Sequence, residues 1–152
     1  MCLIVDTNVA HQALFDPADP EFEPVYKSLF GNGKPEQTLV YGGALADEYK
    51  VSGPISRAVE ELLRAGRAWR EDDDAVNAET RLVTQPCTSN DPHVIALARV
   101  SGVRLLCTHD KNSGLMADFK KKSLIDKPRG HIYTRKKNSS LLSDKCPCKR
   151  CN

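Results

Sequence analysis

The stretch Leu3-Ile4-Val5-Asp6-Thr7-Asn8 decides the fold of this chain. Three branched apolar residues run into an acid without alternating with polar residues. This pattern is typical of a short strand that is buried on both faces of a parallel sheet. Asp6 then stands at the carboxyl end of the strand, where open α/β sheets place their ligands. An aspartate in this position either belongs to a site or simply starts a turn.

A second stretch of the same design lies late in the chain. Residues 103–108 read as another buried strand, and Asp110 follows it. The preceding helix is marked by Asn90 or Asp91 as its cap and by Pro92 in its first turn. Because a helix and the strand after it run antiparallel in an αβ unit, the start of the helix lies over the strand's carboxyl end. The pattern therefore predicts Asp6, Asp91 and Asp110 at one edge of a parallel sheet.

The rest of the chain alternates between helical and strand-like segments, which is typical of the α/β class. Turn residues such as Gly, Pro, Asn and Asp separate the segments. Further helices are expected at 9–15, 24–30, 44–50, 54–65, 73–83 and 92–101, and further strands at 38–41, 68–70 and 131–133.

The length and the amino-terminal segment suggest a single soluble unit. A chain of 152 residues fits one domain with a substantial core. Its first apolar segment, residues 2–5, is too short for the apolar region of a signal peptide or for a membrane span. We therefore expect a cytoplasmic protein that does not interact with a membrane.

The net charge of +2 conceals an acidic body and a basic end. Of the 22 Lys and Arg residues, 11 follow Asp118, whereas only 2 of the 20 Asp and Glu residues do. An acidic body suits a cation site, and a basic end suits a polyanion such as nucleic acid or is merely a solvated tail. The residues expected to contact such a nucleic acid are Lys120, Lys121, Lys122, Arg135, Lys136 and Lys137.

Six cysteines are distributed in a way that argues against a disulfide scaffold. Cys2 and Cys107 lie in buried-strand patterns, while three others crowd the last seven positions. In an intracellular protein such a cluster more often binds metal, or has no ligand, than forms disulfides. Structural zinc usually takes four ligands, so the fourth would come from a His, from Cys87 or from another chain. The candidate zinc ligands are Cys146, Cys148 and Cys151.

These stretches together resemble the ordered motifs of the PIN-domain nucleases. The resemblance rests on residues 5–8, on an acid after the second strand, and on residues 90–98 and 108–112. That family includes the ribonuclease toxins of bacterial toxin–antitoxin pairs. The resemblance covers residues 1 to about 124 and implies a parallel sheet sandwiched between helices. It divides the chain into a nuclease-like domain at 1–134 and a short, basic, cysteine-containing tail at 135–152.

The resemblance assigns the acidic residues one by one. Asp6 matches the first metal-binding acid, Asp91 the acid that opens the late helix, and Asp110 the acid after the last core strand. Glu48 is the choice for the second acid, with the adjacent Asp47 as the alternative. Their side chains point about 100° apart around a helix, so only one of them faces the site.

Small polar residues accompany these acids in the resemblance. Thr7, Asn8 and Thr108 match neighbours that hold carboxylates or water, and Asn112 stands where many relatives have another acid. Neither His93 nor His109 has metal-ligand spacing with another histidine, so the sequence assigns neither of them to the site.

These assignments imply hydrolysis of RNA that depends on Mg²⁺ or Mn²⁺. Carboxylate oxygens suit such hard cations, which activate water and neutralise charge on a phosphodiester. In-line attack by water would leave a 3′-hydroxyl and a 5′-phosphate. The resemblance further implies an antitoxin partner and a homodimer. The alternative is a catalytically weak or inactive PIN-like protein that binds RNA or acts as a scaffold.

Overall fold

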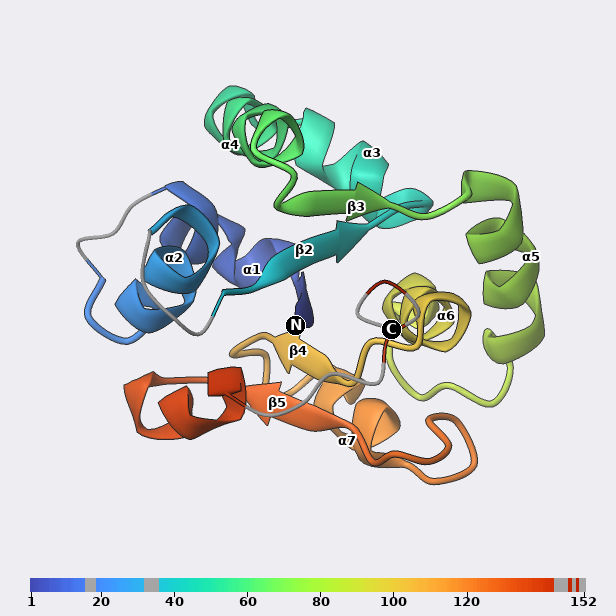
Figure 1. The fold of residues 1–152 in the computed structure, drawn as a ribbon. Coiled ribbons are helices and arrows are strands. Elements are labelled where there is room, and N and C mark those ends of the chain that lie inside the picture. Colours follow the sequence, from blue (N-terminus) through green and yellow to red (C-terminus); the bar gives the residue numbers. More distant parts are fainter. Residues whose placement is uncertain (16–18, 32–35, 144–147, 149, 151–152) are drawn as a thin grey trace.

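A computed structural model of the protein describes residues 1–15, 19–31, 36–143, 148 and 150. It contains a five-stranded, all-parallel sheet flanked by helices, in the order β3-β2-β1-β4-β5 (Figure 1). This confirms the predicted α/β class with a central parallel sheet. The strands are β1 (Cys2–Val5), β2 (Thr38–Tyr41), β3 (Ala68–Arg70), β4 (Leu105–Cys107) and β5 (His131–Tyr133).

The helices lie close to their predicted positions, with three differences. The segment expected as one helix at 9–15 is a turn of α-helix followed by a π-helical segment. Two short helical segments, α7 and η2, carried no clear periodicity and were not predicted. The helical elements are α1 (Thr7–Ala10), η1 (His11–Phe15), α2 (Glu23–Phe30), α3 (Ala44–Lys50), α4 (Gly53–Arg64), α5 (Asp73–Val83), α6 (Pro92–Ser101), α7 (Leu115–Lys120) and η2 (Lys136–Ser143).

The strand order creates a reversal of direction between β1 and β4. The chain runs from β1 outward through β2 to β3, then crosses back to β4 and continues to β5 on the other side (Figure 1). Because parallel crossovers are right-handed, outward and returning connections place their helices on opposite faces of the sheet. Ligands of open α/β sheets bind at such a reversal, outside the carboxyl ends of the strands.

The two strands beside this reversal form the centre of the core. Leu3, Ile4 and Val5 have no exposed surface, which explains why β1 shows no alternation of polar and apolar residues. Val5 is paired with Cys107, and the amide of Asp6 donates a 2.9 Å hydrogen bond to the Cys107 carbonyl. The first residues beyond β1 and β4 therefore lie side by side.

A glycine turn directs α3 toward this same edge of the sheet. Gly43 follows β2 and has φ +57°, a left-handed conformation that favours glycine. A Cβ at Gly43 would lie 2.7 Å from Cγ1 of Val76, so a side chain there would also clash. The Gly43 amide donates a 2.9 Å hydrogen bond to Asp73, which fixes the turn. The turn starts the helix that carries Glu48.

The cysteine prediction needs a correction. The structure joins Cys2 of β1 to Cys148 by a disulfide, although the two residues are 146 positions apart. A disulfide sulfur is not a thiolate, so Cys148 is not available as a zinc ligand while it is paired with Cys2. Cys146 and Cys151 lie outside the described residues. The sequence pattern treated Cys2 only as a core residue, because nothing local shows that the end of the chain returns to β1.

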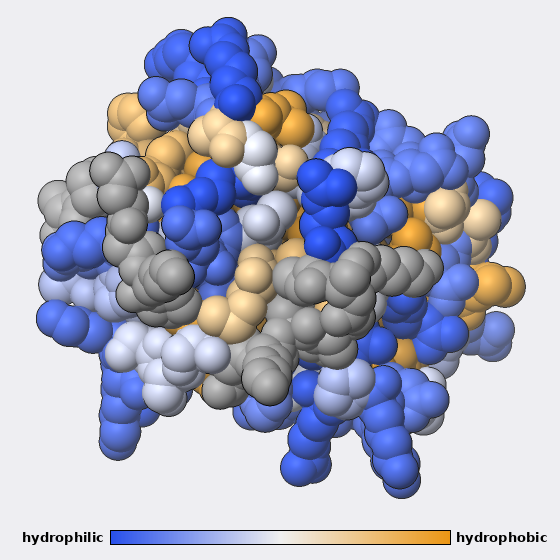
Figure 2. All heavy atoms as spheres, viewed as in Figure 1, coloured by the Kyte–Doolittle hydropathy of each residue, from blue (hydrophilic) through white to orange (hydrophobic). Residues whose placement is uncertain are grey.

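The surface carries no extended apolar area on the face seen in Figure 2. That face is mostly hydrophilic, with small and separate apolar areas (Figure 2). Within the described ranges, no helix is both long and apolar enough to cross a bilayer. The exposed large apolar side chains there are Phe15, Val51, Leu63, Trp69 and Leu82, and single exposed residues of this kind are common.

Candidate metal centre

Asp6 is held by its neighbours at the carboxyl end of β1. The side chain is 5% exposed, and its Oδ2 accepts a 3.0 Å hydrogen bond from the hydroxyl of Thr108, which follows β4. The Asn8 amide donates a 3.1 Å hydrogen bond to that same hydroxyl oxygen. The polar residues at the two strand ends therefore orient the Asp6 carboxylate.

Glu48, and not Asp47, faces this carboxylate. Oε2 of Glu48 accepts a 3.0 Å hydrogen bond from the Thr7 hydroxyl, immediately after Asp6. The Asp47 side chain is 78% exposed and lies 4.0 Å from the ammonium of Lys50. The angular separation of successive helical residues thus selects Glu48 as the second acid at the site.

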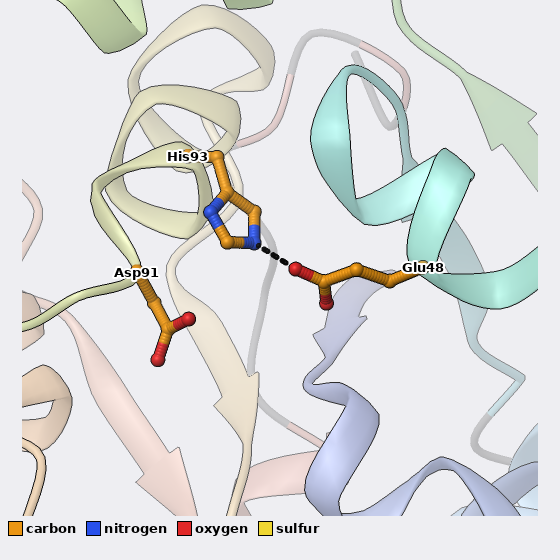
Figure 3. Close-up of side chains that lie close together, drawn as sticks. All are labelled: Glu48, Asp91 and His93. Atoms are coloured by element: carbon orange, nitrogen blue, oxygen red, sulfur yellow. Dashed lines mark ion pairs between the residues drawn. The ribbon is translucent and has the colours of Figure 1, made fainter.

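Asp91 and His93 approach from the start of α6. Asp91 is the N-cap residue, but its carboxylate makes no capping hydrogen bond to the helix and is left for the site. His93, two residues later, is 8% exposed, and its Nε2 lies 2.9 Å from Oε1 of Glu48. Figure 3 shows the His93 ring between α6 and the Glu48 carboxylate, with Asp91 beside it. One potential ligand atom from each of the three residues lies within 4.8 Å of the other two.

The pKa values show that negative charge is crowded here. Burial raises the pKa of Asp6, and the charges of Asp91 and Glu48 add to this, against the Thr108 hydrogen bond. Burial also raises the pKa of Asp91, helped by Glu48 and Asp110. Such shifts are expected where carboxylates gather without a cation.

The imidazole partly compensates this charge. Contact with His93 lowers the pKa of Glu48, against the effect of burial. Burial by itself lowers the pKa of His93, but Glu48, Asp91 and Asp6 outweigh it and raise the pKa above its ordinary value. Because a raised histidine pKa favours the imidazolium, the ring can offset part of the negative charge, and Nε2 must lose its proton before it can bind an ion.

Asp110 lies at the rim of the same group. Its carboxylate accepts 3.0 Å hydrogen bonds from the amides of Asn112 and Ser113. Contacts with these two residues lower the pKa of Asp110. Its amide donates a 3.2 Å hydrogen bond to Thr108, which ties this loop to the end of β4. Asn112 is exposed, and its contact with Asp110 is through the main chain.

The basic residues predicted to contact RNA form two groups, which lie at opposite ends of the parallel strands. Lys120 and Lys122 line a hollow of about 190 Å³ that also includes Arg129. This region adjoins the amino end of β4, because Arg104 contacts the Pro128 carbonyl at 3.0 Å. The site is at the carboxyl ends of the strands, on the far side.

The second basic group, Arg135 to Lys137, directly follows the carboxyl end of β5. The amide of Lys136 donates a 3.1 Å hydrogen bond to the carboxylate of Glu21. Because all strands are parallel, this group belongs to the same edge of the sheet as Asp6. Of the two predicted basic groups, this one lies at the same ends of the strands as the acidic group.

The sequence analysis missed two residues that shape the site. The spacing of His93 to the other histidines indicates no metal site, whereas its neighbours in the structure are Glu48 and Asp91. Asp118 of α7 is 1% exposed and accepts hydrogen bonds from the amides of Thr88 and Ser89 at 2.9–3.1 Å. Ser89 in turn accepts a 3.3 Å hydrogen bond from the Asp91 amide. The buried carboxylate therefore supports the loop that presents Asp91.

We expect Asp118→Asn to lower the free energy of unfolding by about 2 kcal/mol, because the new amide group would face main-chain N–H donors. Burial alone would raise the pKa of Asp118, but hydrogen bonds from Ser89 and Thr88 outweigh it and lower the pKa. Asp118 therefore stabilises the fold above roughly pH 4, and this stabilisation is lost as the pH falls through the folded-state pKa. Urea unfolding from pH 7 to pH 3 should show that the difference in the free energy of unfolding between wild type and variant becomes smaller in acid. A constant difference would contradict this role.

The donor set fits a divalent cation. Carboxylate oxygens from separate segments converge, two of the carboxyl groups have raised pKa values, and a buried imidazole nitrogen points into the group. Such a donor set could bind a metal ion. Comparisons with protein-family models, with curated proteins and with solved structures found no match.

Proposed function

We propose that the protein is a metal-dependent endoribonuclease with a PIN-like site, and that this site is the carboxylate group at the ends of β1 and β4. The observation that carries the proposal is the convergence of Asp6, Glu48 and Asp91 with His93 at the reversal of strand order. Three separate segments of the chain supply these residues. Burial, with a smaller effect from the neighbouring carboxylates, raises the pKa of Asp6 and Asp91, and a bound cation would favour their ionised forms.

Each residue of the site has a separate role in this proposal. Glu48, Asp91 and His93 would hold a divalent cation, and Asp6 would lie beside it, oriented by Thr108. The ion, when bound, would activate water and neutralise charge on the phosphodiester. Asp110, at the rim, adds a further carboxylate near Asp91. The thiol of Cys107 has no role as a nucleophile, because it is fully buried and burial raises its pKa.

The end groups of the products test this chemistry. We expect labelled RNA incubated with the protein and Mn²⁺ or Mg²⁺ to yield fragments with 5′-phosphate and 3′-hydroxyl ends. A 2′,3′-cyclic phosphate would contradict the proposal, because it arises from attack by the ribose hydroxyl instead of water. RNA that is bound but never cleaved would favour the inactive binding or scaffold protein.

The proposal assigns RNA binding near the site to Arg135, Lys136 and Lys137. Replacing all three by Ala should weaken RNA binding about tenfold and reduce the slope of log affinity against log salt by about 2, since each phosphate contact with a single strand contributes about 0.7. The main-chain contact of Lys136 with Glu21 survives this change.

The matched control replaces Lys120, Lys121 and Lys122 by Ala. This removes the same charge at the amino ends of the strands, on the side away from the acidic site. Fluorescence anisotropy in EDTA, with a labelled RNA of about ten nucleotides, would compare the two variants without cleavage. The control should change affinity much less. Equal losses of RNA affinity in the two variants would show that the position of the basic group relative to the acidic site does not affect binding. An antitoxin partner, a homodimer and a cytoplasmic location stay predictions from the family resemblance.

A further inference from the structure

We propose that His93 is a direct metal ligand and that it makes this site prefer a divalent first-row transition ion, such as Mn²⁺, over Mg²⁺. The inference rests on the proposed function in using the same site, but it concerns which ion the site selects and is tested without RNA.

The first argument is the buried nitrogen of His93. The residue is 8% exposed, and Nε2 makes no hydrogen bond of acceptable geometry with any described residue. The polar atom that Nε2 approaches, Oε1 of Glu48, is itself a potential metal ligand, so an ion bound between the two would satisfy both buried groups. Figure 3 shows this nitrogen directed at the Glu48 carboxylate, with the Asp91 carboxylate on the other side of the ring.

The second argument is the distance between the nitrogen and the carboxylate. Nε2 of His93 and Oε1 of Glu48 are 2.9 Å apart. Two atoms that bind one octahedral ion at about 2.1 Å lie about 3 Å apart when they are adjacent ligands. The observed separation matches this value. Asp91 supplies a third donor within 4.8 Å of both, so a small side-chain adjustment completes one face of a coordination shell.

The chemical consequence follows from the type of donor. Mg²⁺ strongly prefers oxygen ligands and retains several waters, whereas imidazole is a good ligand for first-row transition ions. A site of three carboxylates would accept both classes. Replacing one oxygen donor by an imidazole nitrogen favours the transition ion, and affinity rises along the series from Mn²⁺ onward. Mn²⁺ is the suitable probe, because it also accepts the carboxylates.

A purely structural role for His93 makes different predictions. In that case a protonated imidazole would pair with Glu48 in the folded protein and would be unavailable to an ion. Metal would then bind through carboxylates alone, and Mn²⁺ and Mg²⁺ would respond alike to changes at position 93.

The test measures Mn²⁺ bound to the chelator-treated, full-length protein. Pulsed electron paramagnetic resonance of the Mn²⁺ complex should show coupling to a directly bound ¹⁴N nucleus, and His93→Gln should abolish it. By titration, His93→Gln should weaken Mn²⁺ binding about tenfold or more while changing Mg²⁺ binding by less than about threefold. The matched control is His131→Gln, an exposed histidine at the start of β5, which should leave both affinities unchanged.

Each outcome bears on the proposal. Nitrogen coupling in the wild-type protein supports it even if His93→Gln fails to fold. Absence of the coupling at saturating Mn²⁺, or equal weakening of Mn²⁺ and Mg²⁺ binding in a folded variant, would overturn it. A protein that binds Mn²⁺ through nitrogen but cleaves no RNA would support this inference and refute the nuclease. RNA cleavage that is equal with Mg²⁺ and Mn²⁺, in a protein whose Mn²⁺ complex shows no nitrogen coupling, would support the nuclease and refute this inference.

Discussion

Asp6→Asn is expected to reduce metal-dependent RNA cleavage about a thousandfold, the scale of losing one preorganised charged contact at a reaction centre. The variant keeps the shape of the side chain and an oxygen that accepts the Thr108 hydrogen bond. It removes one charge from a crowded, buried group in which Asp91 and Glu48 already raise the pKa of Asp6. The free energy of unfolding measured in EDTA should therefore stay the same or increase.

Loss of activity without loss of stability would distinguish a site residue from a structural one. Initial cleavage rates at saturating Mn²⁺ and thermal unfolding in EDTA are the two measurements. Asp74→Asn serves as the control, because this exposed aspartate lies in the first turn of α5, after β3 at the side of the sheet, and is not one of the residues assigned to the acidic site. A folded Asp6→Asn protein that retains cleavage within about threefold of wild type would remove Asp6 from the reaction centre.

Glu48→Gln is expected to weaken Mn²⁺ binding about a hundredfold, whereas Asp47→Asn should leave it unchanged. The glutamine loses the charge that contacts His93 and that accepts the Thr7 hydrogen bond. Asp47 is adjacent in sequence, but its side chain is 78% exposed. Asp47 and Glu48 both carry a carboxylate, so they differ mainly in the direction in which the side chain leaves α3. The affinity is read from calorimetric titration of chelator-treated protein.

Cleavage at low and high Mn²⁺ separates binding from chemistry for this pair. If Glu48 acts mainly by holding the ion, excess Mn²⁺ should restore much of the lost activity. The assignment fails if Asp47→Asn has the larger effect on Mn²⁺ affinity, because the opposite face of α3 would then meet the ion.

The sequence was informative about the edge of the sheet where the site lies. An uninterrupted apolar run followed by Asp6 predicted a central strand with an acid at its end. Pro92, with Asn90 or Asp91 as the cap, predicted the start of α6. Both depend on local pattern. The order of helices and strands then placed these residues at one edge, because parallel strands end on the same side.

The remaining features depend on contacts between distant segments. The choice between Asp47 and Glu48 required the orientation of α3, which the turn at Gly43 sets against Val76. The disulfide between Cys2 and Cys148 joins residues at the two ends of the chain. No periodicity or spacing within a segment reports on such contacts.

His93 shows the same limit at the site itself. Its position two residues after Asp91 was visible, but its partner Glu48 is 45 residues earlier in the chain and on another helix. A search for pairs of histidines could not find it. A search for any donor near a helix-opening aspartate would have included it as a candidate.

The most direct test of the account is RNA cleavage by chelator-treated wild-type protein as Mn²⁺ is returned in steps. The account predicts no cleavage in EDTA and a rate that rises in proportion to the Mn²⁺ bound at the Glu48, Asp91 and His93 site, measured in the same samples. Cleavage that persists in EDTA, or a protein that binds Mn²⁺ at this site and never cleaves RNA, would contradict it.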